Sequence, residues 1–174
     1  PAGHSFQAHV GPMRPTSRGE IKLKSNKPSD APSIQFNYMQ TEHDLNEMRD
    51  GIEIARDIFN QRAFDEYRGK ELSPGIQEKS KESINEFIRN KGDTAYHPSC
   101  TCKMGNDESS VVNEELKVYG IDKLRVVDAS IMPNIITGNL NAATVMIAEK
   151  ASDLILKHSP LELEEHNFYR ANYN

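Results

Sequence analysis

The residues best suited to chemistry lie close together at positions 96–105, in the sequence YHPSCTCKMG. His97 is the only histidine of this segment, and Pro98 after it restricts its backbone to an extended conformation. An imidazole fixed in this way is suited to act as a general base near neutral pH. The alternative is a histidine that only makes hydrogen bonds within a loop, and the residues alone leave both interpretations open.

The same segment contains the only two cysteines of the chain, Cys100 and Cys102. No second pair is present to complete a structural zinc site, and two cysteines this close do not form a disulfide framework. Ser99 lacks the G-x-S-x-G surroundings of an esterase nucleophile. We therefore expect no metal site, and we expect reduced thiols in an intracellular setting.

Two later segments end or begin elements in ways that suit ligand binding. Asp128 closes the largely apolar run 124–128, and ligands gather at the carboxyl ends of strands in α/β sheets. The alternative for Asp128 is a turn or a helix cap. Residues 137–144, TGNLNAAT, open an apolar helix. An asparagine there is an ordinary cap, but the small residues after it would also let a flat ligand approach free N–H groups.

The elements that must position these segments follow from hydrophobic periodicity. Alternation with period two predicts strands at 6–10, 21–24 and 34–38, and apolar runs predict two more at 116–120 and 124–128. Helical spacing predicts helices at 45–59, 81–90 and 143–155. Thr41 with Asp44 resembles a capping box before the first helix, and Gly92 stands where a C-terminal cap is expected.

Composition restricts what the chain can do alone. Among 174 residues, 21 Lys and Arg against 26 Asp and Glu leave a net charge of −5, which argues against a nucleic-acid binder. The apolar content of 36% is low for a self-sufficient domain. The closest two glycines, Gly69 and Gly75, are too far apart for a G-x-G-x-x-G or Walker-type phosphate loop. Because the first residue is Pro1, we expect a piece of a larger protein.

Four strings together resemble the glucose-methanol-choline (GMC) flavoprotein oxidoreductases: MRPTSRGEIKLKS, YHPSCTCKMG, LRVVDASIMP and GNLNAATVMIAEKASD. The likeness covers most of residues 5–157 and is closest to the choline-oxidising members. It implies an α+β or α/β architecture, the carboxyl-terminal part of a two-domain GMC fold. Residues 1–92 would belong to the substrate-binding domain, with an antiparallel sheet and helices. Residues 93–158 would supply the active-site loop and the last strands and helix of the FAD-binding domain, and 159–174 a polar tail.

The resemblance also implies a role for each candidate residue. FAD is the implied cofactor, His97 the base for the alcohol hydroxyl, and Asn141 the second active-site residue, which hydrogen-bonds the alcohol oxygen. Tyr96 is an implied cofactor-binding residue. Asp128, Ala129 and Ser130 would lie near the diphosphate and ribityl chain of FAD. Ala142, Ala143 and Thr144 would face the flavin pyrimidine edge. Ala143 departs from the family, in which proline is common at this position.

The implied activity is FAD-dependent oxidation of an alcohol by hydride transfer to the flavin, with choline oxidised to betaine aldehyde on the way to glycine betaine. The implied partners are the alcohol and the remainder of the same polypeptide, and the electron acceptor is not indicated. One alternative is another alcohol dehydrogenase or oxidase of the family. Another is an isolated, non-catalytic fragment that binds FAD weakly or not at all. The expected location is intracellular, either cytoplasmic or membrane-associated, and mitochondrial if the source is eukaryotic.

Overall fold

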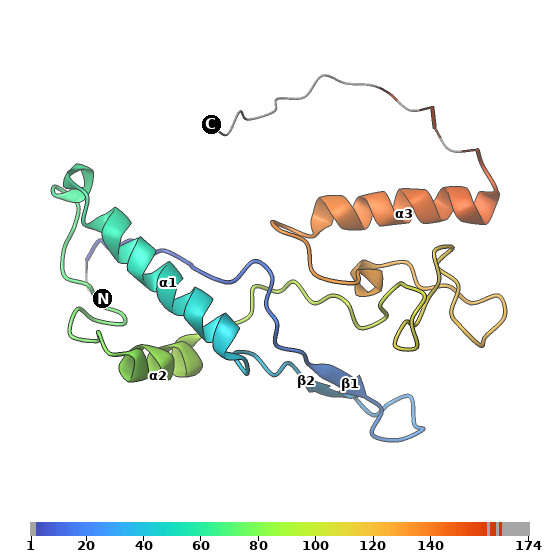
Figure 1. The fold of residues 1–174 in the computed structure, drawn as a ribbon, viewed down its shortest axis with the longest axis horizontal. Coiled ribbons are helices and arrows are strands. Elements are labelled where there is room, and N and C mark those ends of the chain that lie inside the picture. The colour runs from blue at the N-terminus through green and yellow to red at the C-terminus, as the bar shows by residue number, and fades with distance from the viewer. Residues whose placement is uncertain (1–2, 160, 163, 165–174) are drawn as a thin grey trace.

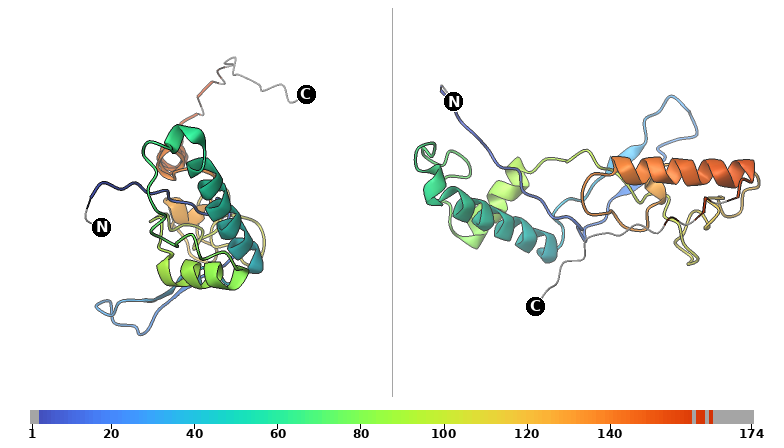
Figure 2. Two further views of the ribbon diagram at one scale, coloured as in Figure 1. Left: turned by 90° about the vertical axis from the view of Figure 1, so that its left-hand side faces the viewer. Right: turned by 90° about the horizontal axis from the view of Figure 1, so that it is seen from above.

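The computed structural model describes residues 3–159, 161–162 and 164, and most of the predicted polar tail lies outside them. In chain order the elements are β1 (Glu20–Lys22), β2 (Ser33–Gln35), α1 (Glu42–Phe59), the 3-10 helix η1 (Arg62–Phe64), α2 (Lys81–Lys91), the 3-10 helix η2 (Ala129–Ile131) and α3 (Asn141–Leu156). Figures 1 and 2 show α1 and α2 at one end of an elongated molecule and α3 over a layer of loops at the other. No helix in the described part of the chain has the length and apolar character needed to cross a membrane.

The first apolar core lies between α1 and α2. Leu45 and Ile52 are buried on α1, and Ile84 and Ile88 on α2. These residues belong to the apolar stripes that the helical spacing predicts, so the two helices are confirmed. Each begins at a hydroxyl cap: Thr41 accepts from the Asp44 N–H, and Ser80 accepts from the Ser83 N–H.

Asp44 is fully buried and joins α1 to the segment before β1. Its carboxylate accepts hydrogen bonds from the backbone N–H and hydroxyl of both Thr16 and Ser17, at 2.5–2.9 Å. Burial opposes ionisation and is the largest single influence, yet the Ser17 and Thr16 donors together hold the pKa of Asp44 well below its usual range. The predicted capping box is therefore only half formed: Thr41 caps the helix, but the Asp44 side chain binds elsewhere.

The strands are shorter than the alternation predicts. β1 and β2 pair antiparallel with Ile21 opposite Ile34. The predicted strand at 6–10 is wrong, because its apolar side chains pack on α1 instead of on a sheet. Phe6 packs against Phe59, with ring centroids 5.0 Å apart, and Val10 packs on the α1–α2 core.

The second apolar core lies beneath α3. Its buried members come from loops, η2 and the helix: Val112, Leu116, Ile131, Met132, Leu140, Ile147 and Ala151. Segments 116–120 and 124–128, predicted as strands, form only isolated bridges, such as Lys117 with Arg125. No described strand flanks them to extend the pairing, and Leu124 and Val127 remain 45% and 37% exposed. The expectation of a strand buried on both faces therefore does not hold within the described residues.

Candidate active site

His97 lies in the loop that runs from α2 toward the α3 core, and it is half-buried. Its Nε2 is 3.0 Å from Oδ1 of Asn139, which stands in the loop just before α3. Its Nδ1 hydrogen-bonds the backbone carbonyl of Ala95. The fold thus brings together two polar side chains that are 42 residues apart in the sequence.

These two contacts define what the imidazole can do. A carbonyl only accepts hydrogen bonds, so the Nδ1 that faces Ala95 carries a proton and donates it. With Oδ1 of Asn139 facing Nε2, both ring nitrogens donate, as in an imidazolium. If the Asn139 amide turns over, its NH₂ group donates to the free Nε2 lone pair of a neutral ring. The pair can therefore hold His97 in place with or without a proton on Nε2.

Asn141, the predicted second active-site residue, is the first residue of α3 and is exposed. Among the described residues no hydrogen bond joins its side chain to His97, whose Nε2 contacts Asn139. The segment Asn139-Leu140-Asn141 contains two asparagines. The backbone conformation at the start of α3 determines which of them faces the His97 loop. The sequence assigns no role to Asn139, because the resemblance implies a role only for Asn141, as the contact of the alcohol oxygen.

Backbone hydrogen bonds tie the His97 loop to the Asp-Ala-Ser segment. The N–H groups of Cys100, Cys102 and Met104 donate to the carbonyls of Ala129, Ser130 and Ile131, at 3.3, 2.9 and 2.8 Å. Oδ1 of Asp128 accepts from the Ser130 N–H at 2.7 Å and caps η2. The cap interpretation of Asp128 thus describes its side chain, while the segment also lies directly beside the candidate base's loop.

The start of α3 is open. Its N-cap residue, Leu140, has no side-chain oxygen to offer, so the first N–H groups of the helix receive no side-chain cap. These groups belong to Asn141, Ala142 and Ala143, while the Thr144 hydroxyl donates back to the Leu140 carbonyl at 2.9 Å. Two small side chains beside uncapped N–H donors fit a flat, electron-rich group such as a flavin pyrimidine edge.

The remaining residues of the loop that the sequence singles out differ in exposure. The Tyr96 side chain is 79% exposed, at a residue with a left-handed backbone, φ 58°. Cys100 and Cys102 are half-buried free thiols. In the described part of the chain no group of three or more His, Cys, Asp or Glu is arranged to hold a metal ion.

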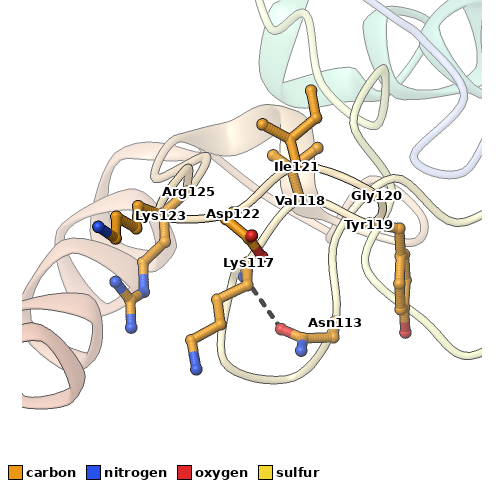
Figure 3. Close-up of a pocket in the computed structure, with 9 residues that line it drawn as sticks. All are labelled: Asn113, Lys117, Val118, Tyr119, Gly120, Ile121, Asp122, Lys123 and Arg125. Atoms are coloured by element: carbon orange, nitrogen blue, oxygen red, sulfur yellow. Dashed lines mark hydrogen bonds between the residues drawn. The ribbon is translucent and has the colours of Figure 1, made fainter.

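Figure 3 shows a pocket outside this site. It is open, and it is lined by Asn113, Lys117, Val118, Tyr119, Gly120, Ile121, Asp122, Lys123 and Arg125. Two of its cations already have partners, because Lys117 pairs with Glu115, and Arg125 Nε donates to the Glu115 carbonyl at 3.1 Å. It includes neither His97 nor Asn139, so it is not part of the candidate active site.

Comparison with known proteins assigns the chain to a class. The GMC oxidoreductase family model matches residues 15–148. This chain belongs to the GMC oxidoreductase family, which confirms both the resemblance and the expectation of a partial GMC fold.

Individual relatives agree. The chain is 56% identical over 168 residues to an oxygen-dependent choline dehydrogenase of Pseudomonas fluorescens, a match covering 97% of this chain and 30% of the relative. It is 54% identical over 166 residues to one of Pectobacterium carotovorum, covering 95% of this chain and 30% of the relative. The chain thus spans about a third of the length of these relatives.

Solved structures show the same fold. Pyridoxine 4-oxidase from Mesorbium loti superposes with a TM-score of 0.79 at 35% identity, covering 85% of this chain and 29% of that one. A formate oxidase from Aspergillus oryzae RIB40 superposes with a TM-score of 0.78 at 31% identity, covering 84% of this chain and 26% of that one.

Proposed function

We propose that this chain is the part of an FAD-dependent alcohol oxidoreductase that carries the catalytic base, and that the alcohol is choline, oxidised to betaine aldehyde. The observation that carries the proposal is the hydrogen-bonded pair of His97 and Asn139 beside the uncapped start of α3. The relatives named choline dehydrogenases, at 54–56% identity, support the choice of substrate. The same names make oxygen the first electron acceptor to test. We place the enzyme inside the cell, in the cytoplasm or at a membrane.

The residues of this chain would form only one side of the FAD-binding site. The N–H groups of Ala142 and Ala143, with Thr144, would face the pyrimidine edge, and Asp128, Ala129, Ser130 and Tyr96 would lie along the rest of the cofactor. When bound, FAD supplies the two-electron acceptor that takes a hydride from the carbinol carbon. The positive end of the α3 dipole would stabilise negative charge that develops beside it.

The proton is the task of this chain's own residues. His97 Nε2 accepts the hydroxyl proton, because Nδ1 is already committed to the Ala95 carbonyl. Asn139 then accepts a hydrogen bond from the new Nε2–H and keeps the ring in place. Asn141, two residues further along the chain, remains the predicted contact for the alcohol oxygen. We also retain the domain assignment, with residues 1–92 on the substrate side and 93–158 on the cofactor side.

The test uses the complete polypeptide loaded with FAD, mixed anaerobically with substrate while flavin absorbance is followed. Choline should reduce the flavin faster than simple alcohols do. His97→Ala should slow reduction at least ~100-fold, the usual scale for losing a general base. Asn139→Ala should slow it about tenfold or more, because the Asn139 side chain holds the His97 ring. Asn141→Ala should slow it as well, because Asn141 is the predicted contact for the alcohol oxygen. Near-normal reduction in His97→Ala would refute the role of the base.

A second substrate class is worth including, because structural neighbours are named for pyridoxine and formate oxidation. Reduction by pyridoxine or another alcohol, but not by choline, would keep the reaction type and overturn the substrate.

The non-catalytic alternative is tested on the chain alone. The 174 residues contain no glycine-rich phosphate loop, so FAD should bind them weakly or not at all in a fluorescence titration. Tight, stoichiometric binding would contradict the view that this chain holds only one wall of the site.

A further inference from the structure

We propose that Thr94 and Tyr38 are positioning residues that determine which ring nitrogen of His97 carries the proton. The proposal deepens the role of His97 as the base and rests on the proposed function. In the described part of the chain neither side chain has a hydrogen bond to the imidazole. Both act through the peptide bond between Ala95 and Tyr96.

The Thr94 hydroxyl is where two hydrogen bonds meet. Its Oγ1 accepts from the backbone N–H of Tyr96 at 3.0 Å and from the phenol of Tyr38, also at 3.0 Å. The Tyr96 N–H and the Ala95 carbonyl belong to one peptide unit, which is planar and trans, so they point in opposite directions. Holding the N–H against Thr94 therefore aims the carbonyl away from Thr94, and His97 Nδ1 binds it there.

The tautomer of His97 follows from this orientation. An oriented carbonyl beside Nδ1 favours the ring form with its proton on Nδ1. Nε2 then keeps its lone pair for the incoming proton, and the Asn139 amide faces this lone pair with its NH₂ group in the neutral form and with Oδ1 once Nε2 is protonated. A peptide turned the other way would present an N–H, which favours the opposite form. The hydroxyl of Thr94 thus selects the form of His97 that can act as a base at Nε2.

The turn needs such a restraint because its backbone is unfavourable. Tyr96 adopts a left-handed conformation, with φ 58°. That conformation costs a non-glycine residue about 1 kcal/mol or more, so other contacts must offset it. The hydrogen bond from the Tyr96 N–H to Thr94 is the contact that closes this turn.

Tyr38 ties the turn to a different part of the chain. It follows β2, and its ring stacks on Phe36 with centroids 5.0 Å apart and an interplanar angle of 9°. The stacking limits the motion of the phenol, which reaches Thr94 across 56 residues of sequence. The hairpin that contains β1 and β2 therefore restrains the loop of the candidate base.

Nuclear magnetic resonance of the complete polypeptide with ¹⁵N-labelled histidine reads the tautomer directly, without turnover. The His97 signals are assigned by their loss in His97→Gln. Wild type should show a single form, with the proton on Nδ1. Thr94→Val should shift the ratio of the two forms by about five- to tenfold, the usual scale of one hydrogen bond. Thr94→Ser should restore the wild-type spectrum.

Tyr38→Phe removes only the phenol oxygen and should give a smaller shift in the same direction. Tyr67→Phe is the matched control, because Tyr67 is 72% exposed and its hydroxyl has no partner among the described residues. Flavin reduction should slow about five- to tenfold in Thr94→Val, with KM changed less than about twofold. In a His97→Ala background the same substitution should have no further effect.

A folded Thr94→Val protein with the wild-type tautomer would overturn the proposal, as would an equal loss of rate with and without His97. If Thr94→Val fails to fold, Tyr38→Phe with unchanged spectrum and rate would overturn it instead. A tautomer shift in a protein that choline does not reduce would support this inference while refuting the proposed substrate. The two failures are therefore distinguishable.

Discussion

Asp44→Asn removes a negative charge from a fully buried position without changing the shape of the side chain. The carboxylate accepts four hydrogen bonds, two from Thr16 and two from Ser17. An amide can accept on only one side. The Ser17 hydroxyl already accepts from Gln40 and Thr41 backbone N–H groups, at 3.0 and 3.3 Å, so the new NH₂ group must face Thr16.

The cost follows from what Thr16 loses. Its hydroxyl can rotate and accept from the amide, but its backbone N–H, now bonded at 2.7 Å, would face another donor. Hydrogen bonds to a charged group contribute about 1.5–3 kcal/mol each, and the Ser17 bonds also weaken when the charge is lost. We therefore expect a local destabilisation of about 2–3 kcal/mol.

Hydrogen exchange measured by mass spectrometry on peptides covering residues 14–18 and the start of α1 would check this value. Exchange there should be about 30- to 150-fold faster in Asp44→Asn than in wild type. The matched control is Asp50→Asn, an exposed aspartate on the same helix. A change in Asp44→Asn no larger than in this control would refute the assignment of the four hydrogen bonds as the anchor.

The pH dependence has a definite sign. Because the pKa of Asp44 is lower in the folded than in the unfolded state, its contribution to stability is full above about pH 4, near the unfolded value. The contribution is lost as the pH falls toward the native pKa. The difference between wild type and Asp44→Asn should therefore be constant near neutrality and shrink in acid.

Three further substitutions and one control test the contacts of the α1–α2 end. Ile88→Ala should cost about 2–5 kcal/mol of stability in denaturant unfolding, because Ile88 is buried, whereas Ile54→Ala, on the exposed face of α1, should change it by less than about 0.5 kcal/mol. Arg56→Lys should speed proteolysis between residues 61 and 78. Arg56 donates to the Glu71 carboxylate from two nitrogens, at 2.9 and 3.1 Å, and the single ammonium group of lysine cannot form this bidentate pair. Gly92→Ala should lower the free energy of unfolding by about 1–2 kcal/mol, seen as a lower unfolding midpoint, because the added Cβ would lie 2.6 Å from the Ile88 carbonyl oxygen. Equal midpoints for Ile88→Ala and Ile54→Ala, or wild-type behaviour of the other two variants, would contradict these contacts.

Local signals predict the helices well and the strands poorly, for physical reasons. The stripe through Leu45 and Ile52 buries itself against α2, a neighbour close in the chain, so periodicity alone is enough. The apolar run at 124–128 needs flanking strands to become a ladder, and the described residues supply only single bridges. Gly92 does end α2, but with extended dihedrals, φ −61° and ψ 140°, rather than the left-handed cap that glycine suggests.

In the candidate site, too, some features could be predicted from the sequence and others could not. The position of His97 in a chemistry-rich loop is visible in the sequence, because proline and small polar residues surround it. Its partner is not visible, because Asn139 and Asn141 differ only in how the chain enters α3. The link from Tyr38 to Thr94 joins residues whose types carry no catalytic signal, so only the folded chain reveals it.

The backbone contacts of the His97 loop also bear on which sequence changes this region accepts. Every second N–H from Cys100 to Met104 binds a successive carbonyl of η2. Between these contacts Thr101 is exposed and can vary, whereas Lys103 is half-buried and pairs with Asp107. A one-residue insertion or deletion there would turn the bonded N–H groups outward and carry His97 away from Asn139. The length of this loop should therefore be more constrained than its composition, and libraries for altered substrates should substitute residues here without changing their number.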